Sequence, residues 1–501
     1  MSLSRRTVLR GAVALAALPA AGFTADRRLR SGDPFTLGVA SGEPSSDGVV
    51  IWTRLAPDPL ADDGLGSMPA RAVDVEWEVA ADERFTRIEQ RGIVPAAPEY
   101  AHSVHVELAG LRPGRDYFYR FRAAGHLSPA GRTRTAPESG SLAPLSLCVA
   151  SCSNYEQGWF TAYRRLAEEH SDLVVHLGDY QYEYAARDGG VRRHVGPETI
   201  SLANYRRRHA QYKTDPDLQA AHASAPWVVV FDDHELADNW AGDVPALSQQ
   251  GFMDRRAAAM RAYYENMPLR RSSLPRGADM QLYRRVHWGA LATFHMLDTR
   301  QYRTDQACGD KISDCVDGLD PARTLTGDAQ ERWLLNGFQQ SRARWDVLGQ
   351  QVFFSQVDLT PGPGRGINPD AWDGYAANRD RIVAGLVDSP VRNAVVLTGD
   401  IHSHWAAEVR DRSGTAVATE LVTTSISSGG DGSADTRAAV RAENPHIRYF
   451  ADRRGYIRAR ISADELRADF RELPYVTRPG AAVHTGASFV VPDRERALHA
   501  M

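Results

Sequence analysis

Four uninterrupted apolar runs lie far apart in the chain, and each stops at residue types that bind metals. A continuous apolar run of five or six residues is typical of a strand covered on both faces, as in the parallel sheets of α/β proteins. Open sheets of this kind place ligands beyond the carboxyl ends of their strands, so the pattern predicts that the four ends converge on one site. The runs are 145–150 before Ser151-Cys152, 172–177 before Gly178-Asp179-Tyr180-Gln181-Tyr182, 227–231 before Asp232-Asp233-His234-Glu235, and 394–398 before Gly399-Asp400-Ile401-His402-Ser403-His404.

Each strand end has an ordinary explanation when it is taken alone. A Gly-Asp pair is often a turn, a Cys is often a small core residue, and an Asp-His pair often caps a helix; the four together favour a metal site. Carboxylate oxygens suit Ca²⁺, Mg²⁺ or a ferric ion, whereas a phenolate and a thiolate favour a high-valent metal over Mg²⁺. An Asp shared by two metals holds them about 3.5–4 Å apart, and such a pair binds a phosphoryl group and lowers the pKa of a bound water.

Length and composition limit the alternatives. A chain of 501 residues is too long for one ordinary core and indicates two or three domains. Hydrophobic residues make up 43% and charged residues 24%, which excludes a disordered chain. The net charge of −4 leaves no global basic field, so we expect no nucleic-acid binding beyond a possible substrate. Four Cys exclude a disulfide-dense scaffold; Cys308 and Cys315 are expected to form a disulfide after export, and Cys148 to be a buried thiol.

Residues 1–25 have the pattern of an export signal. The stretch 4–10, with Arg5 and Arg6, resembles a twin-arginine (Tat) signal, and an uncharged stretch of 15 residues follows it. That stretch is too short to cross a hydrocarbon core, which takes about 20 residues, so we expect no transmembrane anchor. We predict cleavage between 20 and 26, the Tat export machinery as a partner, and a secreted, periplasmic or cell-wall-associated protein. Tat exports folded proteins, which suits an enzyme that takes up its metal before it leaves the cytoplasm.

Residues 33–137 alternate as strands between Gly and Pro turns, which predicts an all-β sandwich. Leu111-Arg112-Pro113-Gly114 followed by Tyr117 resembles the turn and tyrosine corner of fibronectin type III domains. We find no cluster of catalytic residue types there and expect a structural or substrate-rim role. The stretch 138–144 is the predicted linker, and 145–490 is the predicted catalytic domain.

Over nearly the whole mature chain, the sequence resembles the calcineurin-like metallophosphoesterases and, among them, the PhoD-type alkaline phosphatases. The resemblance implies a two-sheet α/β/β/α sandwich as the catalytic domain, behind a fibronectin type III-like sandwich. The residues that carry it are 149–152, 177–183, 205–216, 232–235, 297–302 and 398–403.

The resemblance also implies roles for individual residues. Gly178-Asp179-x-x-Tyr182 is similar to the purple acid phosphatase pattern, in which the Asp bridges two metals and the Tyr binds ferric iron. Cys152 falls where the family has an iron-binding Cys. His402 falls where the last His of the superfamily's Gly-His-x-His motif binds iron.

Other residues are implied to serve the second metal and the substrate. Asp400 takes the preceding His position and suits Ca²⁺, Asp233 stands for the metal-binding Asn of Gly-Asn-His-Glu, and His234 stands for the His next to the substrate. The resemblance implies one Fe³⁺ and one or two Ca²⁺ as cofactors. The superfamily's fourth block supplies a His, but the corresponding stretch 347–352 has none, so we expect oxygen ligands at the second metal. Asn239 could supply one such oxygen, although a helix cap explains it equally well.

Arg300 follows the strand-like run 290–297 and is the candidate for phosphate binding. An Arg at a strand end can bind a phosphate through two N–H groups; the alternative is an ordinary ion pair with Asp298. Arg206-Arg207-Arg208 is expected to form a solvated helix face. The remaining candidates are given no metal role: His176, expected in the core, His404, Asp310, Asp314 and Asp317.

Together these observations predict an exported alkaline phosphatase that acts on phosphate monoesters and diesters. We expect a metal-activated water or hydroxide to attack phosphorus in line, with Asp233, His234 and Arg300 at the reacting group. A phospholipase-D-like phosphodiesterase on the same scaffold is the alternative enzyme, because the ester preference depends on a pocket rim that the motifs do not describe. A non-catalytic cell-surface binding protein is a further alternative, which the complete ligand set disfavours.

Overall fold

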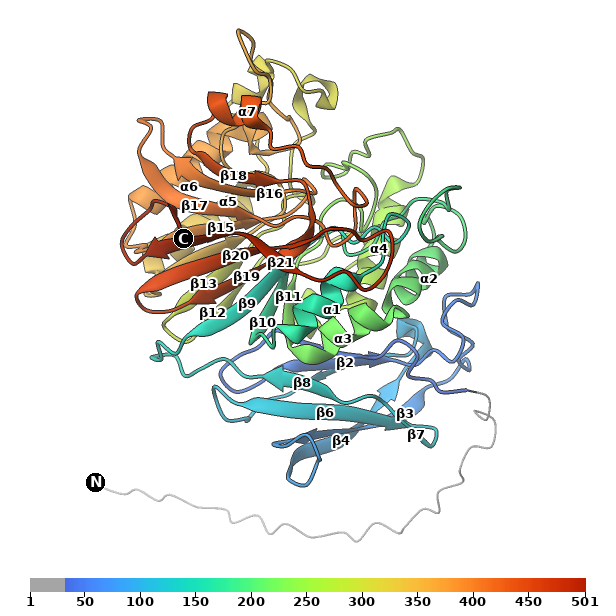
Figure 1. The fold of residues 1–501 in the computed structure, drawn as a ribbon. Helices are drawn as coiled ribbons and strands as arrows, with labels where there is room; N and C mark the ends of the chain where they lie inside the picture. The colour runs from blue at the N-terminus through green and yellow to red at the C-terminus, as the bar shows by residue number, and fades with distance from the viewer. Residues whose placement is uncertain (1–31) are drawn as a thin grey trace, which may run out of the picture.

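The structure is a computed structural model that describes residues 32–501, so the predicted signal, 1–25, lies outside the described residues. Two large sheets face each other, with a smaller sheet beside them at the N-terminal end (Figure 1). The large sheets share one apolar core, to which Val175 and Val228 contribute from one sheet and Phe294 and Val395 from the other. The predicted two-sheet catalytic fold is therefore present.

The first large sheet contains three of the four predicted strands as neighbours. Its order is β22-β21-β20-β19-β9-β10-β11-β1-β2-β5, and β9, β10, β11 and β1 run parallel. Because β9, β10 and β11 are parallel, their carboxyl ends lie at the same edge of the sheet. The bounds are β1 (Val39–Gly42), β2 (Val50–Arg54), β5 (Ser103–Glu107), β9 (Leu145–Ala150), β10 (Leu173–His176), β11 (Pro226–Val229), β19 (Arg454–Ile461), β20 (Glu465–Leu473), β21 (His484–Pro492) and β22 (His499–Ala500).

The fourth predicted strand, β15, belongs to the second large sheet. The order of this sheet is β12-β13-β14-β15-β17-β16-β18, and β13, β14, β15 and β17 run parallel. The four strand ends therefore meet across the gap between two sheets rather than along one. The bounds are β12 (Arg284–Trp288), β13 (Ala292–Met296), β14 (Trp345–Gly349), β15 (Ala394–Thr398), β16 (His404–Arg410), β17 (Ala416–Val422) and β18 (Ile447–Ala451).

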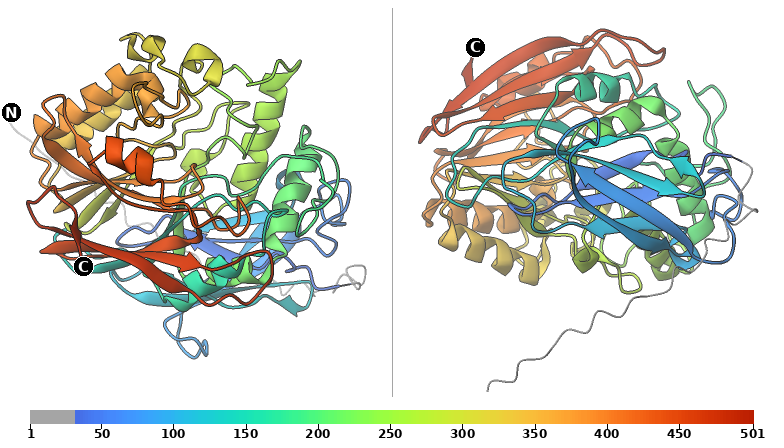
Figure 2. Two further views of the ribbon diagram at one scale, coloured as in Figure 1. Left: turned by 45° about the horizontal axis from the view of Figure 1, so that its top comes forward. Right: turned by 90° about the horizontal axis from the view of Figure 1, so that it is seen from below.

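Helices cover the outer faces of both large sheets (Figure 2). Leu166 of α1 and Leu218 of α3 pack into the core of the first sheet, and Phe338 of α5 and Ile382 of α6 pack against the second. The α-helices are α1 (Thr161–Glu168), α2 (Leu202–Lys213), α3 (Pro216–Ser224), α4 (Phe252–Asn266), α5 (Gly327–Gln340), α6 (Ala376–Val387) and α7 (Ala438–Glu443). The short 3-10 helices are η1 (Pro98–Tyr100), η2 (Arg271–Ser273), η3 (Ala307–Asp310), η4 (Val316–Leu319) and η5 (Trp372–Tyr375).

The N-terminal sandwich shares one of its two sheets with the catalytic region. The smaller sheet packs its apolar face, with Val75 and Phe121, on Val39, Ile51 and Val104 of the first large sheet. The predicted tyrosine corner is present, because the Tyr117 hydroxyl accepts a hydrogen bond from the Arg112 backbone N–H at 2.9 Å. The strands of the smaller sheet are β3 (Val73–Ala80), β4 (Ile88–Ala96), β6 (Asp116–Ala123), β7 (His126–Leu127) and β8 (Gly131–Arg134).

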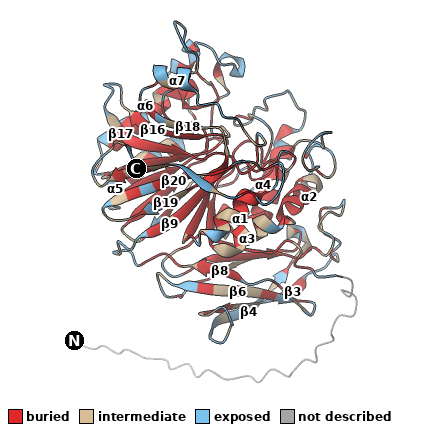
Figure 3. Ribbon diagram, viewed as in Figure 1, coloured by how far each residue is buried: buried red, intermediate tan, exposed pale blue. Residues whose placement is uncertain are grey.

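The prediction of a solvated face at Arg206-Arg207-Arg208 was wrong. All three side chains are buried, as are most residues of α2 (Figure 3). The Arg206 guanidinium binds both carboxylate oxygens of Glu265 at 2.7 Å, Arg207 pairs with Asp62, and Arg208 donates to backbone carbonyls. Glu265 therefore neutralises Arg206 inside the fold, whereas Arg207 reaches the exposed carboxylate of Asp62 and Arg208 is held by backbone carbonyls.

Three other predictions about single residues are confirmed. Cys308 and Cys315 form a disulfide, with Cα atoms 6.0 Å apart. Cys148 is a buried thiol, and burial raises its pKa to about 12. His176 lies in the core, where it stacks on Trp227.

Candidate metal centre

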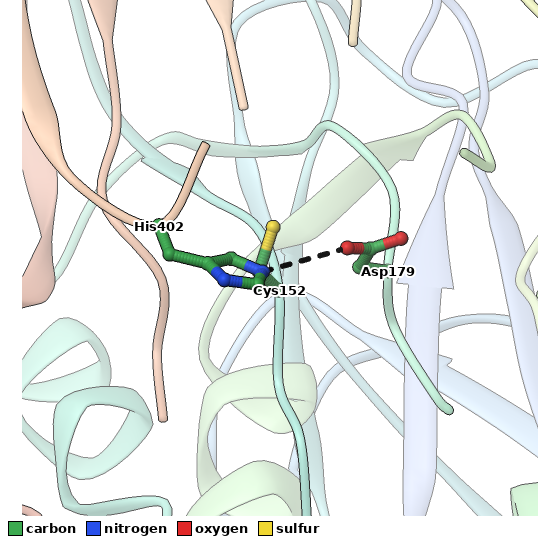
Figure 4. Close-up of side chains that lie close together, drawn as sticks. All are labelled: Cys152, Asp179 and His402. Atoms are coloured by element: carbon green, nitrogen blue, oxygen red, sulfur yellow. Dashed lines mark ion pairs between the residues drawn. The ribbon is translucent and has the colours of Figure 1, made fainter. Parts of the chain in front are cut away.

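The predicted ligands meet at the carboxyl ends of β9, β10, β11 and β15. Three overlapping groups have ligand atoms that all lie within 4.8 Å of one another: Cys152, Asp179 and His402; Asp179, Asp233 and His234; and Asp232, Asp233 and Asp400. Figure 4 shows the side chains of the first group pointing toward one another. Asp179 belongs to the first two groups and Asp233 to the last two, which is the arrangement expected of carboxylates between two metals.

The backbone at these strand ends has an unusual conformation. Cys152, Asp179, Asp400 and His402 have φ angles of 59°, 55°, 65° and 52°, in the left-handed region that few residues other than glycine adopt. Strained residues of this kind gather at functional sites, where the surrounding structure holds them. Gly178 makes the turn before Asp179 possible, because a Cβ atom there would lie 2.4 Å from the Cβ of Asp232.

Tyr182 connects the first group to its surroundings. Its hydroxyl donates to Oδ2 of Asp179 at 2.9 Å, lies 3.0 Å from Nε2 of His402, and accepts a hydrogen bond from Oγ of Ser428 at 2.7 Å. Arg208 donates to the backbone carbonyl of Tyr182. Four groups that can bind a metal through an electron pair thus face one space: the thiol of Cys152, the phenol of Tyr182, the imidazole of His402 and the carboxylate of Asp179.

Glu235 fixes two of the strand ends. Its carboxylate accepts the backbone N–H groups of Asp179 at 3.0 Å, Asp232 at 2.9 Å and Tyr180 at 2.7 Å. The motif predicts no role for Glu235, because two of its partners, Asp179 and Tyr180, lie in the loop after β10, 56 and 55 residues away in the sequence. Glu235 thereby aligns the loops that carry Asp179 and Asp233.

His234 lies beside the ring of Tyr182, with ring centroids 4.1 Å apart. Its Nδ1 is 2.9 Å from Oε2 of Glu183, whose other oxygen accepts the backbone N–H of Asp238 at 2.9 Å. The sequence pattern predicts no role for Glu183, although it lies in the stretch 177–183 that carries the family resemblance. The pair fixes the orientation of the imidazole and leaves its Nε2 on the side away from Glu183.

Arg300 lies inside the cluster of carboxylates, with 0% of its side chain exposed. Its Nε donates to Asp232 at 2.6 Å, and its Nη1 and Nη2 donate to the two oxygens of Asp370 at 2.9 and 3.0 Å. Nη2 also lies 3.7 Å from Oδ1 of Asp233 and 3.9 Å from Oδ1 of Asp400. The sequence did not single out Asp370, which lies in a loop outside any strand pattern.

Asp298 does not form the side-chain ion pair with Arg300 that the sequence offered as an alternative. Its carboxylate instead accepts the backbone N–H groups of Arg300 at 3.0 Å and Gln301 at 2.9 Å. Asn239 gives its backbone N–H to Oδ2 of Asp233 at 2.7 Å and its side-chain N–H to Asp310 at 2.7 Å. The two roles that the sequence allows for Asn239, an oxygen ligand and a helix cap, stay predictions.

Side chains in two further stretches are engaged in hydrogen bonds. Gln350 and Gln351, in the block that lacks the superfamily's His, are engaged in hydrogen bonds with Thr398, Trp372 and Thr299. His404 accepts the backbone N–H of Thr424 at 3.1 Å and packs against Phe470. Among the described residues, His404 belongs to none of the groups of His, Cys, Asp and Glu side chains that could hold a metal.

The electrostatics of the site fit bound cations. Oδ2 of Asp232 and Oδ1 of Asp233 are buried without a hydrogen-bond partner among the described residues. Burial, reinforced by neighbouring carboxylates, raises the pKa of Asp179 and of Asp400 well above the ordinary value. Burial likewise raises the pKa of the Cys152 thiol. Such groups become anionic ligands when positive charge offsets their desolvation, and a pair of metal ions would supply that charge.

Two facing sheets with helices outside and metal-binding residues at the strand ends define the metallophosphoesterase class. A purple acid phosphatase from yellow lupin, PPD1, shares this fold, with a TM-score of 0.53, 11% identity, and coverage of 91% of this chain and 73% of that one. Within the class, this chain belongs to the PhoD-like phosphatase family, whose model matches residues 147–470, while the family's N-terminal domain matches 21–137.

Two relatives are similar over most of the chain. Alkaline phosphatase D of Bacillus subtilis (strain 168) is 49% identical over 481 residues, which cover 93% of this chain and 82% of that protein. A solved structure of PhoD matches with a TM-score of 0.91 and 48% identity, over 94% of this chain and 92% of that one. The chain is therefore a phosphatase, a metal-dependent hydrolase of phosphate esters. Across residues 32–501, no helix is long and apolar enough to cross a membrane.

Proposed function

We propose that this phosphatase is exported and hydrolyses phosphate monoesters and diesters at a centre with one Fe³⁺ and one or two Ca²⁺. The observation that carries the proposal is the division of the ligands into two kinds around Asp179. Cys152, Tyr182 and His402 supply sulfur, phenol and imidazole donors on one side, and Asp233 and Asp400 supply oxygens on the other. Thiolate and phenolate favour a ferric ion, and carboxylates favour Ca²⁺.

When bound, two such ions lower the pKa of a water and stabilise charge on phosphoryl oxygens. The protein's own groups then orient the reaction. His234, held at Nδ1 by Glu183, presents Nε2 for a hydrogen bond or a proton to the ester oxygens. Asp233 is held at Oδ2 by the backbone N–H of Asn239, and its other oxygen, Oδ1, lies 3.7 Å from Nη2 of Arg300.

The geometry supports a positioning role for Arg300 rather than the phosphoryl-binding role suggested by the sequence. Its guanidinium has no exposed surface and is engaged by Asp232 and Asp370. The positive charge of the Arg300 guanidinium instead offsets the repulsion between the carboxylates proposed to bind the metals, including Asp233. Loss of this charge would therefore disturb the site through its ligands.

Export is supported by the twin-arginine pattern and by the Cys308–Cys315 disulfide, because disulfides persist in oxidising compartments. We propose the Tat machinery as the export partner, with 33–137 as the N-terminal module, 138–144 as the linker and 145–490 as the catalytic domain.

One set of measurements tests the proposal. Protein exported by its own signal should contain about one iron per chain together with calcium, and should hydrolyse both an aryl phosphate and a bis-aryl phosphate between pH 7 and 10. Active protein with zinc and no iron would contradict the metal assignment. Hydrolysis of the monoester alone would contradict the diester assignment, and intracellular retention with an uncleaved signal would contradict export.

A further inference from the structure

The loop that follows β17 contacts both Tyr182 and Cys152 through hydrogen bonds. Oγ of Ser428, in this loop, lies 2.7 Å from the Tyr182 hydroxyl and 2.9 Å from the carbonyl oxygen of Cys152, and it accepts the backbone N–H of Asn154 at 3.1 Å. Ser428 is 0% exposed. A single buried hydroxyl therefore touches one proposed ligand directly and the backbone of another.

Arg454, the first residue of β19, holds this loop in place. Its buried guanidinium donates to Oγ of Ser425 at 2.9 Å and to the carbonyl oxygen of Ser428. Oγ of Ser425 donates to the same carbonyl at 2.6 Å. Gly429 follows with φ +86°, and a Cβ atom there would lie 2.6 Å from Nη1 of Arg454, so glycine is needed for the arginine to approach.

The hydrogen-bonding capacities of these groups assign a direction to the contact. The Tyr182 hydroxyl donates its hydrogen to Asp179, and if Tyr182 bound a metal this hydrogen would be released to solvent as a proton. The phenolate oxygen then only accepts, and the carboxylate of Asp179 cannot donate to it. Ser428 can donate, because the carbonyl of Cys152 also lies 3.4 Å from the backbone nitrogens of Ser427 and Ser428, which can take over that contact.

We propose that Ser428 is a positioning residue of the metal centre, which donates a hydrogen bond to the Tyr182 phenolate, and that Arg454 fixes Ser428 for this task. The inference rests on the proposed ferric centre. A hydrogen bond to a phenolate lowers the energy of the electron pairs on its oxygen. More energy is then needed to transfer an electron from Tyr182 to a ferric ion, so the charge-transfer band lies at shorter wavelength. Partners outside the ligand set also hold ligands in place, and their loss typically lowers metal affinity or activity by about 10–100-fold.

The test compares Ser428→Ala with Ser428→Thr and with Ser427→Ala. Ser427 is a matched control, because it is equally buried in the same loop but its hydroxyl donates to the carbonyl of Asn154 at 2.8 Å rather than to Tyr182. Each variant is exported by its own signal, and visible absorption, iron per chain, the rate of iron loss to a chelator, and melting temperature are measured.

We expect Ser428→Ala to shift the charge-transfer band to longer wavelength and to lose iron about 10-fold faster than wild type. Ser428→Thr, which keeps the hydroxyl, and Ser427→Ala should retain the wild-type band and iron. If Ser428→Ala does not fold, Ser428→Cys replaces it, and its weaker donor should give a smaller shift in the same direction.

The outcomes separate this inference from the proposed function. A wild-type protein without iron or a charge-transfer band overturns the ferric centre and the inference with it. A wild-type band that stays unchanged in Ser428→Ala, with unchanged iron retention, overturns the inference alone. An equal shift in Ser427→Ala also overturns it, because the effect would then come from the loop rather than from the hydroxyl at Tyr182.

Discussion

Arg300 and Asp370 form a fully buried pair in which Nη1 and Nη2 of the arginine donate to the two carboxylate oxygens at 2.9 and 3.0 Å. The two residues are 70 positions apart in the chain. The same guanidinium binds Asp232 and lies 3.7 Å from Asp233. The Arg300 side chain therefore links the loop of Asp370 to the strand end that carries proposed metal ligands. Separating a buried pair leaves an uncompensated charge, which makes this contact a sensitive point of the site.

The first prediction concerns this pair. Asp370→Asn should lower the free energy of unfolding by about 3–5 kcal/mol, because Arg300 and Arg303 both lose the buried carboxylate that they share, and Arg300 keeps only Asp232 as a hydrogen-bonded carboxylate. Arg300→Lys should also lower stability and metal content, because a lysine cannot reproduce the planar fork. Denaturant unfolding and elemental analysis on the same preparations measure both effects. Arg300→Lys enzyme with normal stability and metal content but low kcat/KM would instead indicate direct phosphoryl binding.

Arg381→Lys is the matched control for the first prediction. Arg381 also binds both oxygens of a carboxylate, that of Glu331, at 2.7 and 2.9 Å, but its side chain is 41% exposed. Exposed pairs contribute about 0–1 kcal/mol, so this variant should be nearly as stable as wild type.

The second prediction concerns Asp179. Asp179→Asn keeps the size of the side chain but removes the negative charge shared by two groups of ligands, so activity should fall at least ~10³-fold. Asp298→Asn is the control, because Asp298 accepts backbone hydrogen bonds beside the site and its amide can still accept them. Steady-state kinetics and metal content measure the difference. Near-normal turnover of Asp179→Asn would show that the Gly-Asp pair is only a turn.

The strand ends could be predicted from the sequence because their signal is local. An apolar run followed at once by Asp179 or Asp400 shows both the strand and the place where it stops, and parallel strands bring such ends together. The resemblance implies two sheets but assigns no strand to either, and the run 394–398 has the same pattern as the other three, so only the structure shows that β15 belongs to the second sheet.

The supporting residues could not be predicted, because their roles depend on tertiary contacts. Asp370 and Ser428 lie in loops without a periodic pattern, and their partners are 70 and 246 residues away. A run of charges on a helix, such as the arginines 206–208, predicts a solvated face, but Glu265 neutralises Arg206 from another helix. The local sequence therefore predicts which residues can bind a metal, whereas the residues that hold these ligands in place are recognised only from the tertiary structure.

The third prediction concerns the ferric ion. Tyr182→Phe removes the phenolate donor but keeps a ring that packs beside His234, so the charge-transfer band should weaken or disappear. Tyr184→Phe is the control, because Tyr184 also packs against His234 but its hydroxyl interacts with Asp238, whereas that of Tyr182 contacts Asp179 and His402. Visible absorption at equal iron content measures the effect. A band of unchanged intensity in Tyr182→Phe would assign the colour to another donor.

The fourth prediction concerns the second metal. Chelation of calcium should abolish activity, and Ca²⁺ should restore it better than Zn²⁺, because Asp233 and Asp400 offer oxygen ligands. Asp400→His should move the preference toward Zn²⁺, because imidazole suits zinc better than calcium. Activity after reloading with each metal, at retained iron, measures both effects. Full restoration of the wild-type enzyme by Zn²⁺ alone would contradict the argument from ligand type.

The last prediction concerns pH and uses a group outside the proposed ligand set. Burial lowers the pKa of His176 from the ordinary 6.5 to about 3. Between these values the unfolded chain binds a proton that the folded protein does not, so stability falls as the pH falls from 6.5, by up to about 1.4 kcal/mol per pH unit. His176→Asn removes this titration, and its free energy of unfolding should decline less steeply between pH 6.5 and 5 than that of wild type.

Tyr163→Phe is the control, because it removes the 2.9 Å hydrogen bond to Nε2 of His176 but leaves the imidazole in place, so it should lower stability while keeping the wild-type slope. Denaturant unfolding at three pH values gives the slopes. Equal slopes for wild type and His176→Asn would show that His176 takes up its proton as readily in the folded protein as in the unfolded chain.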